Sequence, residues 1–269
     1  MLSPLENFAK KRPLLLSLLY LFLYVLCCVF IVPNLLLQYI IKTLLSILFL
    51  VLTGLFKNCG LKIKGTGHGL YLGFLFILNG IGGLVIAVLN SDFSSLSLVP
   101  FYDICIFTIN MLFVGLNEEL SFRAFILTSL LNKKQKNYKN IIHSLLLSSL
   151  LFSLVHLVNI PFIQPKALFV QLIAAFSAGL CLGAIYIRSQ SIWPSIIIHS
   201  LIDWFSLFIS SCFISSTENI SASVLNMDMN IWAAIFIAIL SSIIPIIMTI
   251  VLMRPKYFYF DSLNEEDKN

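Results

Sequence analysis

The sequence predicts an all-α fold, a polytopic transmembrane helix bundle of about eight spans with both termini cytoplasmic. Three observations predict it. The 269-residue chain is 59% hydrophobic and 11% charged, whereas soluble globular domains carry about 25% charged residues. Its apolar runs are long enough to cross a hydrocarbon core of ~30 Å, which takes about 20 helical residues. Its Lys and Arg residues collect in alternate connections between those runs, as the positive-inside rule describes.

The apolar runs follow one another with short connections, so we expect residues 1–269 to form a single membrane-embedded domain. The first run follows Lys10, Lys11 and Arg12 but lacks the small-residue cleavage site of a signal peptide, and we interpret it as a span. The second run begins so soon after the first that a re-entrant pair stays open. The predicted spans are residues 13–32, 35–56, 69–90, 104–131, 140–158, 167–187, 192–213 and 231–253.

The cations of the connections assign the sides of the membrane. The intervening connections hold Lys166 as their only cation, together with acidic residues. We therefore expect a multi-pass integral protein of the cell membrane, in contact with membrane lipid. The charges form no basic stripe, so nucleic-acid binding has no support. The cations predicted to face the cytoplasm are Lys10, Lys11, Arg12, Lys57, Lys62, Lys64, Lys133, Lys134, Lys136, Lys139, Arg188, Arg254 and Lys256.

Small residues recur at four-residue spacing in two of the spans, at Gly69 and Gly73 and at Gly179 and Gly183. This spacing lets membrane helices approach each other closely. The six cysteines show no C-x-x-C spacing, and we expect neither a disulfide framework nor a zinc knuckle.

Ionisable side chains inside three of the predicted spans mark a candidate reaction site. A charged group at mid-bilayer costs at least ~2.5–3.5 kcal/mol on insertion scales, so such groups need partners and usually have a function. A single histidine is more often a packing residue, but two glutamates and two histidines on three helices favour a site. The residues are Glu118, Glu119 and Arg123 in span four, His156 in span five, and His199 and Asp203 in span seven.

Helical spacing predicts how these groups pair. Residues four apart share a helix face, so Glu119 can pair with Arg123, and His199 with Asp203. Glu118 is turned about 100° from Glu119 and is the carboxylate left free to act as a general acid or base. Counted from the cytoplasmic ends of their spans, Glu118 and His156 lie deeper than His199, so helix tilt or a span that begins below the surface must bring them level.

The three motifs E-E-x-x-x-R (118–123), F-x-x-x-H (152–156) and H-x-x-x-D (199–203) occur in this order over residues 104–205. Here the sequence resembles the CPBP family of intramembrane proteases (CAAX protease and bacteriocin-processing, also called Abi), relatives of the type II CAAX prenyl endopeptidase. The stretch from Gly179 to Pro194 also looks like this family. The resemblance implies a protease core over residues 104–205 and a peptide or membrane-protein substrate.

The resemblance further implies that a water held between Glu118 and His156 hydrolyses the peptide bond without a cofactor. His199 and its partner would stabilise the oxyanion, Arg123 would hold Glu119, and Glu119 would orient the site. Where the prenyl endopeptidases have Asn, this sequence has Asp203. An ionised Asp cannot donate a hydrogen bond, so either Asp203 is protonated or it orients His199.

Three alternatives remain open. A zinc metalloprotease could use His156, His199 and Glu118 as ligands with water in the fourth position. A non-catalytic membrane protein could confer bacteriocin immunity by binding a partner. A transporter or proton relay also uses buried ionisable groups, although the sequence shows no internal repeat.

Overall fold

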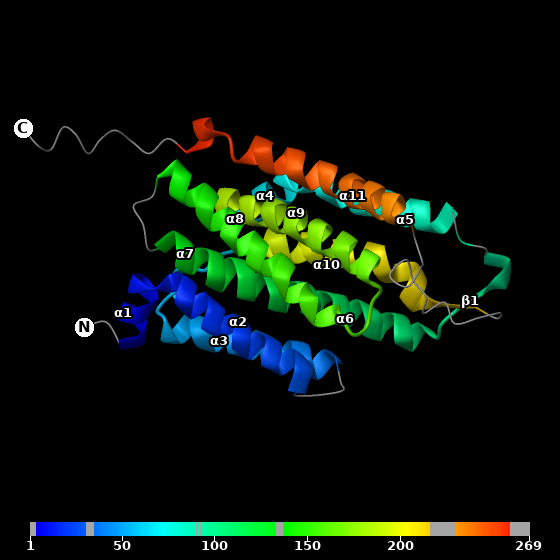
Figure 1. The fold of residues 1–269 in the computed structure, drawn as a ribbon, viewed down its shortest axis with the longest axis horizontal. Helices are drawn as coiled ribbons and strands as arrows, with labels where there is room; N and C mark the ends of the chain where they lie inside the picture. The colour runs from blue at the N-terminus through cyan, green and yellow to red at the C-terminus, as the bar shows by residue number, and fades with distance from the viewer. Residues whose placement is uncertain are drawn as a thin grey trace, which may run out of the picture.

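The computed structural model describes residues 4–30, 35–89, 91, 93–132, 137–215 and 230–258. Nearly all of these residues are helical, and the helices lie side by side in one elongated bundle (Figure 1). Large apolar side chains are exposed on the outer faces, for example Phe22, Leu44 and Ile250, as expected of side chains that contact lipid. The all-α membrane fold predicted from the sequence is confirmed.

The elements follow the predicted spans closely. The first half of the chain forms α1 (Pro4–Lys11), α2 (Pro13–Phe30), α3 (Leu35–Leu52), η1 (Phe56–Asn58), α4 (Thr66–Leu72), α5 (Phe74–Leu89), η2 (Phe93–Ser95) and β1 (Leu96–Leu98). The second half forms α6 (Phe101–Glu119), η3 (Leu120–Leu127), α7 (Thr128–Asn132), α8 (Tyr138–Val155), η4 (His156–Asn159), α9 (Pro165–Ser189), α10 (Trp193–Cys212), β2 (Phe213–Ser215), α11 (Ile231–Leu252) and η6 (Pro255–Tyr257).

Within the described residues, six helices are long and apolar enough to cross a membrane unaided. Two further pairs reach that length together but are bent, α1 with α2 by 114° and α4 with α5 by 56°. Counting each bent pair as one span gives the predicted eight. The first bend falls at Pro13, which cannot continue the preceding helix. The predicted second span is too long, because α3 ends at Leu52 and a turn with Gly54 at φ +68° follows.

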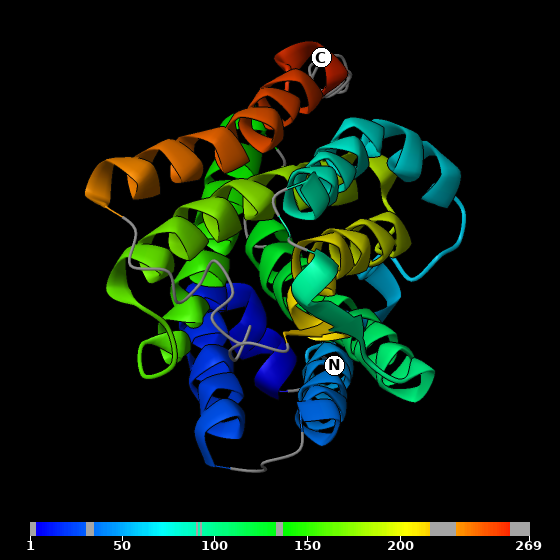
Figure 2. The same cartoon turned by 90° about the vertical axis from the view of Figure 1, so that its right-hand side faces the viewer.

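Viewed along the bundle, α2 and α3 lie on one side and α11 and α5 on the other, with α8, α9 and α10 between them (Figure 2). The predicted close approaches occur. A Cβ atom at Gly69 or Gly73 would collide with α10, and one at Gly179 or Gly183 would press on α8. Both small-residue pairs therefore act by letting these helices touch.

Most of the described cations lie at one end of the bundle, which we call the cationic end. Hydrogen bonds join the elements there: Arg188 Nη1 donates to Leu252 O over 3.0 Å, and Trp193 Nε1 donates to Leu61 O over 2.9 Å. The chain begins and ends its described part at this end (Figure 1). The cations of the described residues that lie there are Lys10, Lys11, Arg12, Lys57, Lys62, Lys64, Lys139, Arg188, Arg254 and Lys256. Lys133, Lys134 and Lys136 fall outside the described residues.

The other end carries Lys166 and a short antiparallel pair of strands, in which Leu96 lies opposite Ser215 and Leu98 opposite Phe213. The clustering of cations at one end agrees with the charge pattern of the sequence. That this end faces the cytoplasm stays a prediction.

Candidate active site

The two glutamates of the first motif lie where the long helix of span four changes its winding. Helix α6 ends at Glu119 and continues as η3, a π-helical segment, and then as α7. Arg123 Nη1 donates to Glu119 Oε1 over 2.7 Å, and both residues are almost completely buried. The predicted ion pair between residues 119 and 123 is therefore present, and it is shielded from water.

Arg123 also ties this helix to two others. Its Nη2 donates to Gly179 O in α9 over 3.4 Å, and its guanidinium lies 4.6 Å from the ring centre of Phe152 in α8. A Cβ atom at Gly179 would lie 3.1–3.2 Å from Ser149 and Phe152, so this position keeps the two helices close. The arginine is thus both the partner of a buried carboxylate and a link among three helices.

His199 is at the centre of a group of carboxylates from two helices. Its Nδ1 lies 2.7 Å from Glu119 Oε1, and its Nε2 lies 3.5 Å from both Glu118 Oε2 and Asp203 Oδ2. Because a carboxylate only accepts hydrogen bonds, Nδ1 of His199 donates to Glu119. The predicted approach of His199 and Asp203 is present, and the structure adds both glutamates to it.

His156 lies at the end of α8, where the chain turns into η4. Its Nδ1 is 2.9 Å from Phe152 O, and because a carbonyl oxygen can only accept, Nδ1 carries the proton. The neutral ring then presents an unprotonated Nε2. The Phe152 ring meets the rings of both His156 and His199 edge-on, with centroids 5.2 Å and 5.8 Å away, and separates the two histidines by one aromatic ring.

A cavity of ≈ 310 Å³ lies beside these histidines, between α5, α8, α9 and α10. Its polar lining comes from His156, His199, Asp203, Gln171 and Ser206, and the rest is apolar. Four alanines of α9 line one wall. Of the predicted site residues, three therefore share one cavity large enough for a side chain of a bound peptide.

Glu118 is not among the residues that line this cavity, although the resemblance implies a water held between Glu118 and His156. Its side chain is 16% exposed, and its Oε2 lies 3.5 Å from His199 Nε2. The difference arises because Glu118 and Glu119 point in directions about 100° apart on their helix, and Glu119 takes the direction that faces Arg123 and the histidine.

Three features of the site were not predicted from the sequence. Lys42 of α3 is buried, with its Nζ 4.9 Å and 4.8 Å from the ring centres of Tyr24 and Tyr39. Asn117, next to Glu118, is buried and accepts a hydrogen bond from Tyr24 over 2.9 Å. The π-helical segment follows directly after Glu119. A cation seven residues into an apolar run was a usable signal for Lys42, and π-helices are frequent at functional sites.

The zinc alternative can be compared with the geometry. Among the described residues, no three His, Cys, Asp or Glu side chains are arranged to hold a metal ion. Nδ1 of His199 faces a carboxylate and Nδ1 of His156 faces a carbonyl. These hydrogen bonds engage Nδ1 and leave Nε2 of each histidine as the atom that a metal would meet. The zinc alternative stays a prediction, and we derive no step through a metal.

The fold and the site together define a multi-pass membrane protein with a buried centre of carboxylates and imidazoles. Residues 100–205 match the family described as type II CAAX prenyl endopeptidase Rce1-like. This segment holds all three motifs, so the middle part of the chain is similar to the CAAX proteases. No curated protein and no solved structure matches the chain.

Proposed function

We propose that the protein is an intramembrane endopeptidase of the glutamic type, in which Glu118 and His156 activate a water molecule against a peptide bond. The observation that carries the proposal is the 3.5 Å approach of Glu118 Oε2 to His199 Nε2 at the edge of a cavity that also holds His156. The Glu118 carboxylate and the His156 imidazole thus lie near the imidazole ring of His199, and the three side chains come from different helices.

The two glutamates take different roles in this proposal. Oε1 of Glu119 is held by both Arg123 and His199, and the side chain is fully buried. Glu119 therefore orients the site. Glu118 is partly exposed, so its carboxylate can meet water. Positioned general acids and bases typically contribute about 10²–10⁴-fold to a rate.

The steps follow from these positions. Glu118 accepts a proton from water, aided by the unprotonated Nε2 of His156, and the water oxygen bonds to the carbonyl carbon of the substrate. The Nδ1 proton of His199 is engaged in the hydrogen bond with Glu119. Only the doubly protonated form of His199 therefore has an Nε2 proton that can donate a hydrogen bond to the oxyanion. The carbon–nitrogen bond then breaks, and Glu118 returns its proton to the leaving nitrogen. Donors aimed at a developing oxyanion are often the largest catalytic contribution.

The substrate in this proposal is a peptide or a segment of a membrane protein. The mostly apolar lining of the cavity, with its wall of α9 alanines, would receive an apolar side chain or chain-like group close to the scissile bond. The residues supply acid, base and oxyanion donor themselves, so the reaction needs no cofactor.

Replacing Glu118→Gln tests the proposal, since glutamine keeps the shape but cannot take a proton. The purified variant in liposomes should fold as the wild type does and lose detectable cleavage of a membrane-anchored peptide that the wild type cleaves. The matched control is Asp103→Asn, an exposed carboxylate at the far end of the same helix, which should leave cleavage unchanged. Full cleavage by the Glu118→Gln variant would contradict the glutamic mechanism.

A further inference from the structure

The wall that α9 gives to the cavity contains one polar side chain, Gln171. The residues of α9 that line the cavity, among them Ala167, Ala174 and Ala178, follow one another at spacings of mostly three or four and share one face of the helix. Apart from Gln171, every residue of this lining face is apolar. An amide among alanines costs free energy unless it is hydrogen-bonded, so this side chain calls for an explanation.

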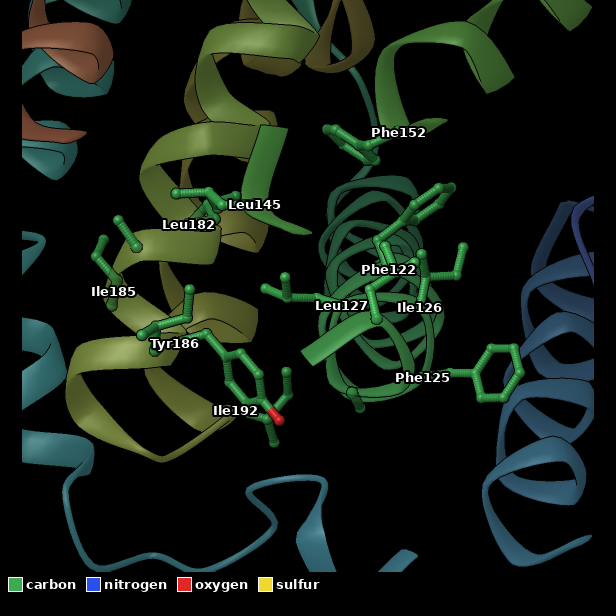
Figure 3. Close-up of a cluster of buried hydrophobic side chains, with 14 of the residues drawn as sticks. Phe122, Phe125, Ile126, Leu127, Leu145, Phe152, Leu182, Ile185, Tyr186 and Ile192 are labelled. Atoms are coloured by element: carbon green, nitrogen blue, oxygen red, sulfur yellow. The ribbon is translucent and has the colours of Figure 1, made fainter. Parts of the chain in front are cut away.

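Toward the cationic end, the cavity offers no polar partner to a bound peptide. Its lining there stops at Phe152 and Leu182, which belong to the cluster of buried apolar side chains in Figure 3. Leu127, Leu145 and Ile185 belong to the same cluster and are also buried. A peptide backbone carries strong hydrogen-bonding groups at nearly every residue. The partners of those groups must therefore come from the polar side chains elsewhere in the lining.

The amide of Gln171 is held in one orientation by Asn159, because Asn159 Nδ2 donates to Gln171 Oε1 over 3.1 Å. Asn159 is itself fixed by the connection between η4 and α9. Its carbonyl oxygen accepts from the backbone N of Phe162 over 2.8 Å and of Ile163 over 3.1 Å. With Oε1 engaged, the two N–H donors on Nε2 of Gln171 have no hydrogen-bond partner within the part of the chain that the structure describes.

Among the polar side chains of the described lining, Gln171 alone has a free donor in every protonation state. Nε2 of neutral His156 is unprotonated, and His199 has an Nε2 proton only when it is doubly protonated. An ionised Asp203 can only accept. Ser206 Oγ already donates its single proton to a backbone carbonyl of its own helix over 2.7 Å. A carbonyl oxygen inside the cavity would therefore find its steadiest donor at Gln171.

We propose that Nε2 of Gln171 donates a hydrogen bond to a main-chain carbonyl of the substrate and so positions the peptide beside His156. This inference rests on the proposed function, because it concerns how the substrate of that reaction is bound. It names the substrate class as a peptide in an extended conformation, recognised by its main chain as well as by the apolar group that enters the alanine-lined wall.

The position of Gln171 indicates which carbonyl it binds. Its partner Asn159 follows His156 by three residues in η4, about 6 Å further along at the ~2.0 Å rise of a 3₁₀ helix. An extended peptide advances about 3.3 Å per residue. The carbonyl bound by Gln171 therefore lies about two residues from the scissile bond.

Binding can be measured without catalysis. The probe is a fluorescent, membrane-anchored peptide that the wild type cleaves, with its scissile amide N-methylated so that it stays intact, and the readout is Kd from fluorescence anisotropy. Gln171→Met keeps the side-chain length but has no donor, and it should raise Kd about five- to tenfold, the effect of one lost hydrogen bond. Gln164→Met is the matched control, because Gln164 is exposed at the N-terminal end of the same helix, and it should leave Kd unchanged.

The carbonyl can be located by replacing single amides of the probe with esters, whose carbonyl oxygens are weaker acceptors. The ester about two residues from the scissile bond should weaken binding to the wild type about threefold. The same ester should have no effect on Gln171→Met, because an interaction that is already absent cannot be lost again. With the cleavable peptide, Gln171→Met should raise KM and leave kcat unchanged, as expected when binding alone is lost. A general loss of packing would not give this pattern.

An unchanged Kd for Gln171→Met would overturn the inference, and so would a variant as sensitive to every ester as the wild type. If thermal unfolding shows that Gln171→Met folds poorly, the wild type alone decides, because indifference to esters throughout the scan would exclude a bound main-chain carbonyl. The proposed function is judged separately by Glu118→Gln, which should bind the probe as the wild type does while failing to cleave the unmethylated peptide.

Discussion

Glu119 Oε1 accepts a 2.7 Å hydrogen bond from His199 Nδ1, although the two residues are 80 positions apart in the chain. The same oxygen holds Arg123 at the same distance. One buried carboxylate oxygen therefore fixes both the cation of its own helix and the imidazole of α10. Because hydrogen bonds with ionised partners are about twice as strong as neutral ones, the bond between Glu119 and His199 helps to hold α6 against α10.

Replacing Arg123→Ala should lower the amount of folded protein. The change leaves the buried Glu119 carboxylate without its cation. Removing one member of a buried ion pair typically lowers the free energy of unfolding by about 3–5 kcal/mol. The measurements are abundance in the membrane and thermal unfolding in detergent. Arg12→Ala removes an exposed arginine and should change neither. Normal stability of the Arg123 variant would show that the pair contributes little.

Asp203→Asn should keep cleavage within about tenfold of the wild type. Asparagine has the same size, and its side-chain nitrogen can donate toward the oxyanion while its oxygen still accepts from His199. Asp203→Leu removes both abilities and should lower kcat more strongly with similar folding. Equal loss in the two variants would assign the negative charge itself to the reaction.

Gly115→Ala should damage the site from about one turn of helix away. A Cβ atom there would collide with Ser200 Oγ and lie 3.0 Å from two backbone atoms of α10. The helices must then separate, and the bond between Glu119 and His199 lengthens. Gly82→Ala is the matched control, since the described residues leave at least 4 Å of free space around its Cβ. We expect lower stability and cleavage for Gly115→Ala and neither loss for Gly82→Ala.

Chelators should leave cleavage unchanged. In the proposed mechanism Glu118 and His156 activate the water, so removal of divalent metals with EDTA or phenanthroline takes nothing from the reaction. The measurement is the cleavage rate of purified protein before and after dialysis against chelator, together with its metal content. Loss of activity that added zinc restores would favour the metalloprotease instead.

Much of the fold could be predicted from local sequence. The spans, the pairing of Glu119 with Arg123 and the close helix contacts at Gly69 and Gly179 depend on helix period, apolar length and side-chain size. The depth of the motifs could not be predicted this way. Residues 101–132 form one rod of 32 residues, about 48 Å at 1.5 Å per residue. This rod is longer than the ~30 Å hydrocarbon core, and the 2.7 Å contact between Glu119 and His199 shows that the two residues are level with each other.

By itself the sequence determined that this is a helical membrane protein and which ionisable residues it places in its spans, because burying polar backbone and charge in lipid leaves few alternatives. Only the tertiary structure decided which partners each of those residues contacts. In the structure, Glu119 pairs with Arg123 and with Nδ1 of His199, whereas Glu118 approaches Nε2 of the same histidine. Packed side chains close the cationic side of the site. These outcomes depend on helix rotation and on contacts between distant segments, and helix period alone specifies neither.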